Sequence, residues 1–172
     1  GLVIDGRLHT GPHGNAGAVG SLPLQSSRQE PRSQLLHKAS GLVLEQALRK
    51  LGLPAAAAHD ARALAPEAKS ATDAWLNEAS PALALTVASA TALLDLDAIV
   101  IDGSLDRSLI EVVLRETDAL LTAEFNWEGM SRPSLLPGSI GADARAMGGA
   151  ILPLHSHFAP NHDLFLKSDT SI

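Results

Sequence analysis

The stretch Ile99-Val100-Ile101-Asp102-Gly103-Ser104 decides the fold class of this chain of 172 residues. Three β-branched residues in a row predict a short buried strand, and the Asp-Gly-Ser that follows predicts a turn at its carboxyl end. A long helical pattern, Ser70 to Asp95, precedes the strand, and a second one follows it, with Asp106 placed to cap its N-terminus. Helices that alternate with strands are typical of an α/β architecture.

Toward the N-terminus the sequence predicts strands and turns. Leu2 to Thr10 reads as a hairpin whose turn is Asp5-Gly6, because Asp-Gly supplies the positive φ of a tight turn. A glycine-rich loop, Gly11 to Gly17, follows, and Val19 to Leu24 fits another short strand. Gln25 to Arg32 is polar and without periodicity, so we expect a loop there.

The remaining segments are mostly helical in pattern. Ser33 to Leu51 predicts one helix that stops at Gly52. Pro81 is expected to kink the Ser70 helix or to divide it into two. Pro133 to Pro137 fits one more strand, and a final helix, Gly141 to about Phe158, is expected to be interrupted near Pro153. With no internal repeat, residues 1–172 are expected to form a single domain.

The composition excludes several classes of protein. The formal net charge of −6 argues against nucleic-acid binding by this chain itself, because phosphate contacts need clustered Lys and Arg. The absence of cysteine excludes disulfides, thiolate nucleophiles and Cys-ligated metal sites. No apolar run approaches the roughly 20 residues of a membrane span, and no signal pattern is present. We therefore expect a soluble, cytoplasmic domain, and the start at Gly1 without a methionine fits a processed or excised fragment.

Few residues suggest chemistry on their own. The loop from Gly11 to Gly20 either closes around a small polar ligand with its peptide N–H groups or is a plain turn. Gly103 follows a strand, and this geometry often receives a ligand at the strand's carboxyl end. The histidines, such as His155 and His157, lack a carboxylate or thiol at a metal-ligand spacing, so we expect ordinary histidines and no metal. No G-x-S-x-G elbow is present, and no catalytic residue is predicted.

Taken in order, these segments resemble the C-terminal half of a ROK protein, a family that unites sugar-responsive repressors and bacterial sugar kinases. Gly1 to Leu8, Gly11 to Gly14 and Ala16 to Ser21 resemble the family's hairpin and its A-G-E-I-G-H signature. The long helix with its following strand, and the Gly141 to Ala150 segment, resemble the later family motifs. The resemblance implies a ribonuclease-H-like, actin-like ATPase domain of the α/β class, with a mixed sheet flanked by helices.

The resemblance also implies a degenerate sugar site. It would include Gly14, Asn15, Gly17, Ala18 and Ser21. Ala18 stands where the family glutamate binds sugar hydroxyls, and Ser21 stands where the family histidine contacts sugar and zinc. Ser27, Gln29 and Gln34 fill three cysteine positions of the family's zinc motif. The family zinc site is therefore expected to be lost, and no metal or other cofactor is expected.

The residues that the resemblance places near the nucleotide also differ from the family's sequence pattern. Asp102 and Gly103 stand where family kinases carry Gly-Gly near the adenosine, and an aspartate adds bulk and negative charge there. The D-x-G-x-T phosphate loop and the Asn-Asp pair of the family's catalytic base are not found in these residues, and phosphoryl transfer depends on such groups. ATP binding and kinase activity are therefore not expected of this segment.

Three interpretations remain open. The first is the effector-sensing and dimerisation domain of a ROK-type transcriptional regulator of sugar metabolism, non-catalytic in this form. Such a domain would be a homodimer, would take a sugar or a sugar derivative as effector, and would contact DNA only through an N-terminal domain absent from this chain. The second is a fragment of a ROK-family sugar kinase that phosphorylates hexoses with ATP. The third is a structural α/β domain that shares only the fold.

Overall fold

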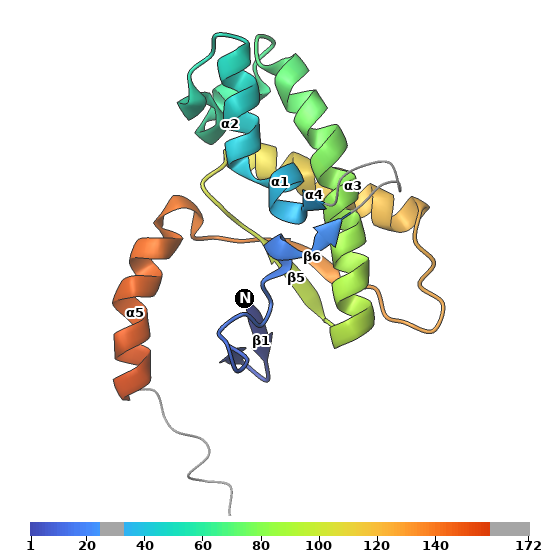
Figure 1. The fold of residues 1–172 in the computed structure, drawn as a ribbon, viewed down its shortest axis with the longest axis vertical. Helices are drawn as coiled ribbons and strands as arrows, with labels where there is room; N and C mark the ends of the chain where they lie inside the picture. Colours follow the sequence, from blue (N-terminus) through green and yellow to red (C-terminus); the bar gives the residue numbers. More distant parts are fainter. Residues whose placement is uncertain (25–32, 159–172) are drawn as a thin grey trace, which may run out of the picture.

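The computed structural model describes residues 1–24 and 33–158 (Figure 1). The loop expected at Gln25 to Arg32, and with it Ser27 and Gln29, lies outside the described residues. Along the chain the elements are β1 (Leu2–Ile4), β2 (Arg7–His9), η1 (Val19–Ser21), β3 (Pro23–Leu24), β4 (Ser33–Gln34), α1 (Leu35–Ala39), α2 (Gly41–Lys50), η2 (Ala55–His59), η3 (Ala61–Leu64), α3 (Lys69–Leu94), β5 (Ala98–Ile101), α4 (Arg107–Ala123), β6 (Ser134–Pro137), η4 (Gly141–Asp143) and α5 (Ala144–Phe158).

The β5–α4–β6 unit confirms the strand and the turn predicted from the central stretch, but the expected burial of the strand is wrong. No residue of β5 is fully buried, and Val100 is 60% exposed, because among the described strands β5 pairs only with β6. β5 and β6 pair in parallel, with Ala98 opposite Ser134 and Ile101 opposite Pro137. The connection between them is α4, because parallel strands need a long crossover. Asp106 caps α4 as expected, since its Oδ1 accepts hydrogen bonds from the next helical N–H groups at 3.0 and 3.3 Å. The carboxyl ends of both strands therefore lie at one edge.

The N-terminal hairpin is also confirmed. β1 and β2 pair antiparallel, with Leu2 opposite His9, and the turn residues Asp5 and Gly6 have φ values of 50° and 73°. Both values are positive, as a type I′ turn requires. The segment expected as a strand from Val19 is instead the short helix η1 followed by β3, which pairs with β4. The described strands form three two-stranded sheets, two antiparallel and one parallel.

Three helix predictions need correction. The single helix expected from Ser33 is divided into α1 and α2, because Ser40 adopts an extended conformation with ψ 147°. Of the two alternatives expected at Pro81, a kink or a division, the division is wrong, because α3 runs unbroken for 26 residues. Pro153 likewise lies inside α5 without ending it, so the expected interruption is wrong. A proline removes one hydrogen bond from a helix, and packing or neighbouring turns can maintain the helix around it.

No helix in the described ranges is long and apolar enough to cross a membrane.

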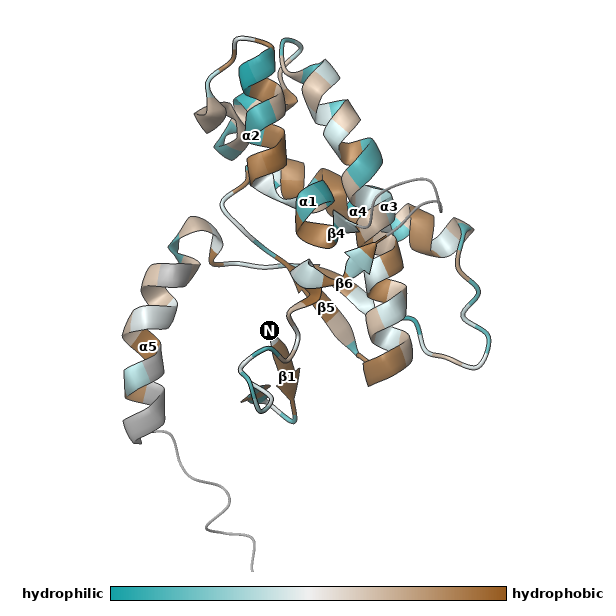
Figure 2. Cartoon of the chain, in the orientation of Figure 1, coloured by the Kyte–Doolittle hydropathy of each residue, from teal (hydrophilic) through white to brown (hydrophobic). Residues whose placement is uncertain are grey.

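The largest cluster of buried side chains lies where α2, η2, α3 and α4 meet. Leu44 and Leu48 of α2 and Leu109 of α4 have no exposed surface, and Trp75 of α3 packs with them. A second cluster joins the C-terminal half of α3 to β5 and β6. Figure 2 shows hydrophobic residues also on β1 and at the C-terminal end of α3, and Figure 1 shows α5 standing away from the rest of the chain. The helical packing thus holds the carboxyl end of β5 in place.

Candidate functional site

A cavity of about 610 Å³ opens at the carboxyl end of β5, and we call it the β5 cavity. Crevices at this end of parallel strands are the usual ligand sites of α/β sheets. The segment between α1 and α2 forms one wall, and Trp75 and Leu83 of α3 form another. The remaining walls come from η1, from the turn after β5, from α4 and from the start of α5. Asp102 and Gly103, the two residues expected on the nucleotide side, both line this cavity.

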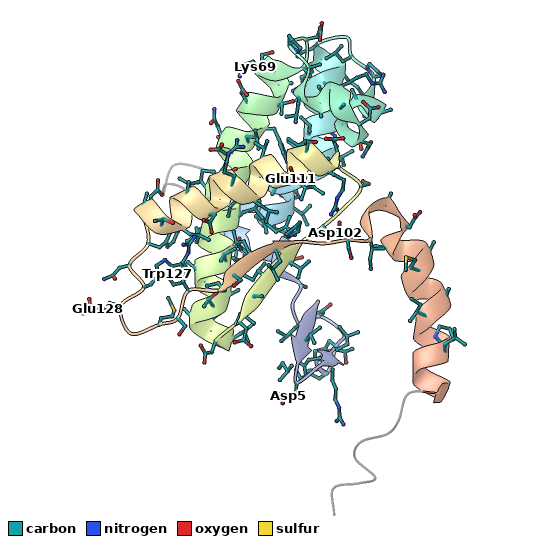
Figure 3. All side chains as sticks on the ribbon, turned by 180° about the vertical axis from the view of Figure 1, so that it is seen from behind. Asp5, Lys69, Asp102, Glu111, Trp127 and Glu128 are labelled. Carbon is teal, nitrogen blue, oxygen red and sulfur yellow. The ribbon has the colours of Figure 1, made fainter. Side chains whose placement is uncertain are left out.

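The carboxylate of Asp102 is held by backbone N–H groups from two separate segments. Its Oδ2 accepts hydrogen bonds from Gly141 at 3.0 Å and Ile140 at 3.1 Å, and its Oδ1 accepts one from Gly103 at 2.9 Å. Arg107, in the first turn of α4, places its guanidinium 2.9 Å from the same Oδ1 and also donates to the carbonyl of Gly138. Figure 3 shows Asp102 between the end of β5 and the segment that leads into α5. The side chain therefore links the β5–α4 turn to the β6–α5 connection.

These contacts change the acidity of Asp102. The N–H of Gly141, and after it that of Gly103, hold the pKa of the Asp102 carboxyl below the ordinary value of an aspartate. Partial burial opposes this shift but is outweighed by the hydrogen bonds. Because a carboxylate is favoured over a carboxylic acid at this position, Asp102 carries its negative charge at neutral pH.

The acid dependence of stability tests this arrangement. A group whose pKa is lower in the folded protein than in the unfolded chain stabilises the fold above the unfolded pKa, and the contribution is lost as the pH falls through the folded pKa. Asp102→Asn should therefore lower the melting temperature at pH 7, and the difference from the natural chain should shrink from about pH 4 downward. Thermal melts from pH 7 to pH 2, with exposed Asp73→Asn as the control, measure the difference. A difference that does not change with pH would contradict this account of Asp102.

A second set of contacts supports the wall of the β5 cavity at Ser104. His59 of η2 places its Nδ1 2.7 Å from the Ser104 carbonyl oxygen and its Nε2 3.1 Å from Oε1 of Glu45. Through these two contacts His59 joins α2 to the turn after β5, and so joins two walls of the cavity.

The residues of the expected sugar site are only partly brought together. Gly17, Ala18 and Ser21 line a groove of about 270 Å³ against α3, which we call the α3 groove. Its other wall is formed by Thr86, Ser89, Ala90, Leu93 and Leu94. Gly14 and Asn15 are not among its lining residues; their backbone atoms instead close the turns of the loop, with Gly14 N–H donating to Gly11 and the Asn15 carbonyl accepting from Ala18.

The two predicted sites are therefore separate in the structure. Gly20 of η1 lines the β5 cavity, and Ala18 and Ser21 line the α3 groove, whereas Val19 between them lines both. Neither Ala18 nor Ser21 offers the carboxylate or imidazole that the family pattern has at these positions. The α3 groove is mainly apolar, and the functional residues of the two predicted sites do not share one cavity.

The chemistry of the family zinc site is not matched by the described residues. Ser21 lies in η1 and Gln34 in β4, and hydroxyl and amide groups are not the usual ligands of zinc. Within residues 1–24 and 33–158, no group of three or more His, Asp and Glu side chains is placed to hold a metal ion. These residues therefore do not fit a zinc ion.

The sequence analysis missed the partners of Asp102. Arg107 lies five residues away on α4, and the Ile140 and Gly141 N–H groups lie 38 and 39 residues away, so no local pattern connects them to Asp102. Trp75, interpreted as part of an apolar helix stripe, is buried and also lines the β5 cavity.

Comparison with known proteins adds to this geometry. Two curated relatives, each named bifunctional enzyme NanE/NanK, come from Brucella melitensis biotype 1 and Brucella suis biovar 1. Each is 31% identical over 156 residues, and the match covers 88% of this chain but only 28% and 27% of the relatives. This chain thus spans little more than a quarter of these curated relatives.

A solved structure supports the fold. A ROK family protein from Streptococcus pneumoniae TIGR4, determined in complex with sucrose, superposes with a TM-score of 0.65 at 19% identity. The match covers 90% of this chain and 54% of the S. pneumoniae chain. The α/β, ribonuclease-H-like fold expected from the sequence is confirmed by this likeness. The ROK family model matches residues 1–155, and with that extent of match the chain belongs to the ROK family.

Proposed function

We propose that this chain is the effector-sensing and dimerisation domain of a ROK-family transcriptional regulator of sugar metabolism, and that it is non-catalytic. The observation that carries the proposal is the carboxylate of Asp102. It occupies the N–H groups of Gly103, Ile140 and Gly141 at the carboxyl end of β5. Backbone N–H groups gathered in this way are what a phosphate needs for binding.

A resident carboxylate opposes a nucleotide at this edge in two ways. It uses the backbone hydrogen-bond donors, and it pairs with the guanidinium of Arg107, so neither these N–H groups nor that cation is available to a phosphate. The residues at this edge therefore do not fit ATP, and no phosphoryl-transfer step is derived for them. A regulator tolerates this loss because it needs only to bind an effector.

The second candidate is part of a sugar kinase, and one observation favours it. The curated relatives are named as enzymes, and the identity of 31% extends over most of this chain. In that interpretation, the groups that bind phosphate and activate the sugar hydroxyl would come from residues outside the matched segment. The Asp102 contacts count against it, because they would have to open before a nucleotide could approach.

The proposal also includes the partners of the protein and its location in the cell. The protein would act in the cytoplasm as a homodimer, and DNA would be contacted by a separate domain, which is consistent with the net charge of −6 here. Exposed apolar side chains that could serve an interface include Leu93 on α3 and Ile151 on α5. The effector would be a sugar or a sugar derivative.

The full-length natural protein separates the two candidates. We expect ADP release in the presence of ATP, Mg²⁺ and hexoses or N-acetylhexosamines to stay at the level of a blank without sugar. We also expect the full-length protein to bind a specific DNA fragment and to slow its migration in a mobility-shift assay. Turnover in the ordinary kinase range of about 1–100 s⁻¹ would overturn the proposal in favour of the second candidate. ADP release is also measured for Asp102→Gly as a comparison, because this substitution frees the three N–H groups without supplying any catalytic group.

A further inference from the structure

We infer that the β5 cavity binds an uncharged small molecule with a largely apolar body, and that Asp102 excludes anions from it. The inference goes beyond the proposed function, because it concerns the ligand of the β5 cavity and not the sugar effector. That ligand would lie in the β5 cavity and not at the glycine-rich loop. The inference also excludes sugar phosphates and nucleotides as ligands of this cavity.

The size and walls of the cavity support a small-molecule ligand. A volume of about 610 Å³ lies within the range of roughly 300–1,000 Å³ typical of such sites. Apolar side chains supply most of the wall, from every element that surrounds the cavity. They include Leu35, Trp75, Leu83, Leu105, Ile110 and Val113. Trp75, Ile110 and Val113 are at least 96% buried, so their positions are fixed by the core and not by a ligand.

The charges around the cavity favour an uncharged ligand. Asp102 is the only ionised side chain among the described residues that line it, and no lysine or arginine is among them. Arg107 lies beside the cavity, but its guanidinium is engaged by Asp102 and by the carbonyl of Gly138. An anion would therefore find the Arg107 guanidinium and the N–H groups of Ile140 and Gly141 already engaged by Asp102, so these groups are not available to bind it.

The polar groups of the cavity are few, and this limits the number of hydroxyls that a ligand can bury. The polar side chains of the lining are the hydroxyls of Ser40 and Ser104, the carboxylate of Asp102 and the indole of Trp75, and the other polar groups are backbone atoms around the glycines. The Nε1 of Trp75 is buried and has no hydrogen-bond partner in the described residues. Ser40 precedes α2, yet its side chain makes no capping hydrogen bond. Buried hydroxyls without partners cost free energy, so a free hexose with five hydroxyls does not match this wall. A neutral molecule with one polar end and an apolar body does.

Two dyes that share one body test the inference directly. N-Phenyl-1-naphthylamine is uncharged, and 8-anilinonaphthalene-1-sulfonate has the same ring system with one sulfonate added. Each is titrated into the full chain bearing Trp127→Phe, which leaves Trp75 as the only tryptophan. We expect saturable one-to-one binding of the uncharged dye, with energy transfer from Trp75, and at least tenfold weaker binding of the sulfonate. Asp102→Asn is expected to narrow this difference severalfold.

A matched pair of variants shows whether binding is in the cavity. Ala142 is exposed and lines the cavity, whereas Ala146 is exposed in the same region but does not line it. Ala142→Phe should weaken binding of the uncharged dye at least tenfold, and Ala146→Phe should leave it unchanged. Both sites are exposed, so neither variant should prevent folding.

Three outcomes would overturn the inference: no saturable binding of the uncharged dye, equal or tighter binding of the sulfonate, or equal effects of the two alanine variants. The dye results are independent of the kinase and DNA assays. Kinase turnover together with the expected dye pattern would overturn only the proposed function.

Discussion

Gly17→Ala is expected to lower the free energy of unfolding by about 3 kcal/mol, whereas Gly14→Ala in the same loop should lower it by about 1 kcal/mol. The two glycines have nearly the same backbone conformation, with φ values of 70° and 72°. Each alanine would therefore have the same conformational cost, about 1 kcal/mol for a left-handed residue. The additional loss belongs to Gly17 alone.

The difference comes from what each new methyl group would meet. A Cβ at Gly17 would lie 2.5 Å from the backbone nitrogen of Leu2 and 2.6 Å from the carbonyl carbon of Gly1, whereas a Cβ at Gly14 would have no atom within 4 Å. Backbone atoms of β1 cannot move aside without disturbing the hairpin, and overpacking of this kind costs about 1–3 kcal/mol. Urea unfolding followed by circular dichroism measures both variants. Equal losses would show that Gly17 does not hold the loop against β1.

Gly138→Ala is expected to displace the carboxylate of Asp102 and to destabilise the chain by about 2–3 kcal/mol. A Cβ at Gly138 would overlap the Cβ, Cγ and Oδ2 atoms of Asp102. The aspartate would then have to leave the N–H groups of Ile140 and Gly141, and those donors would lose their acceptor. The link from β5 to the start of α5 depends on those two hydrogen bonds.

A matched control and a second readout accompany this variant. Gly148→Ala places a methyl group in α5 with no atom within 4 Å, and alanine in a helix should be neutral or stabilising by up to about 1 kcal/mol. The Gly138 variant should also lose the acid-dependent stability assigned to Asp102, because its carboxylate would no longer accept the Gly141 hydrogen bond. If Gly138→Ala is as stable as the natural chain and keeps the same pH profile, the proposed role of Asp102 is wrong.

Local patterns account for the elements that the sequence predicted correctly. Asp5-Gly6 specifies a turn within two residues, Asp106 caps the helix that starts beside it, and Gly52 follows the end of α2. The β-branched run at Ile99 to Ile101 is strand β5, as expected. Each of these features depends on interactions between near neighbours, so the residues themselves contain the information.

The predictions that failed depended on tertiary context. Pro153 was expected to interrupt a helix, and a division of the helix at Pro81 was one of two alternatives, but both helices continue through their prolines. A break at Ser40 divides a segment that has one continuous apolar period. In each case the local preference amounts to a few kcal/mol or less, and the packing of whole elements can exceed it.

The candidate site shows the same division between local and distant information. The sequence by itself determined the fold class, the absence of cysteine and the presence of an aspartate after β5. Only the tertiary structure decided what that aspartate does, because its N–H partners at Ile140 and Gly141 are almost 40 residues away. It also decided that Ala18 and Ser21 line a different groove from Asp102. A cavity depends on which elements pack together, and that packing is set by burial of apolar surface across the whole chain and not by any short pattern.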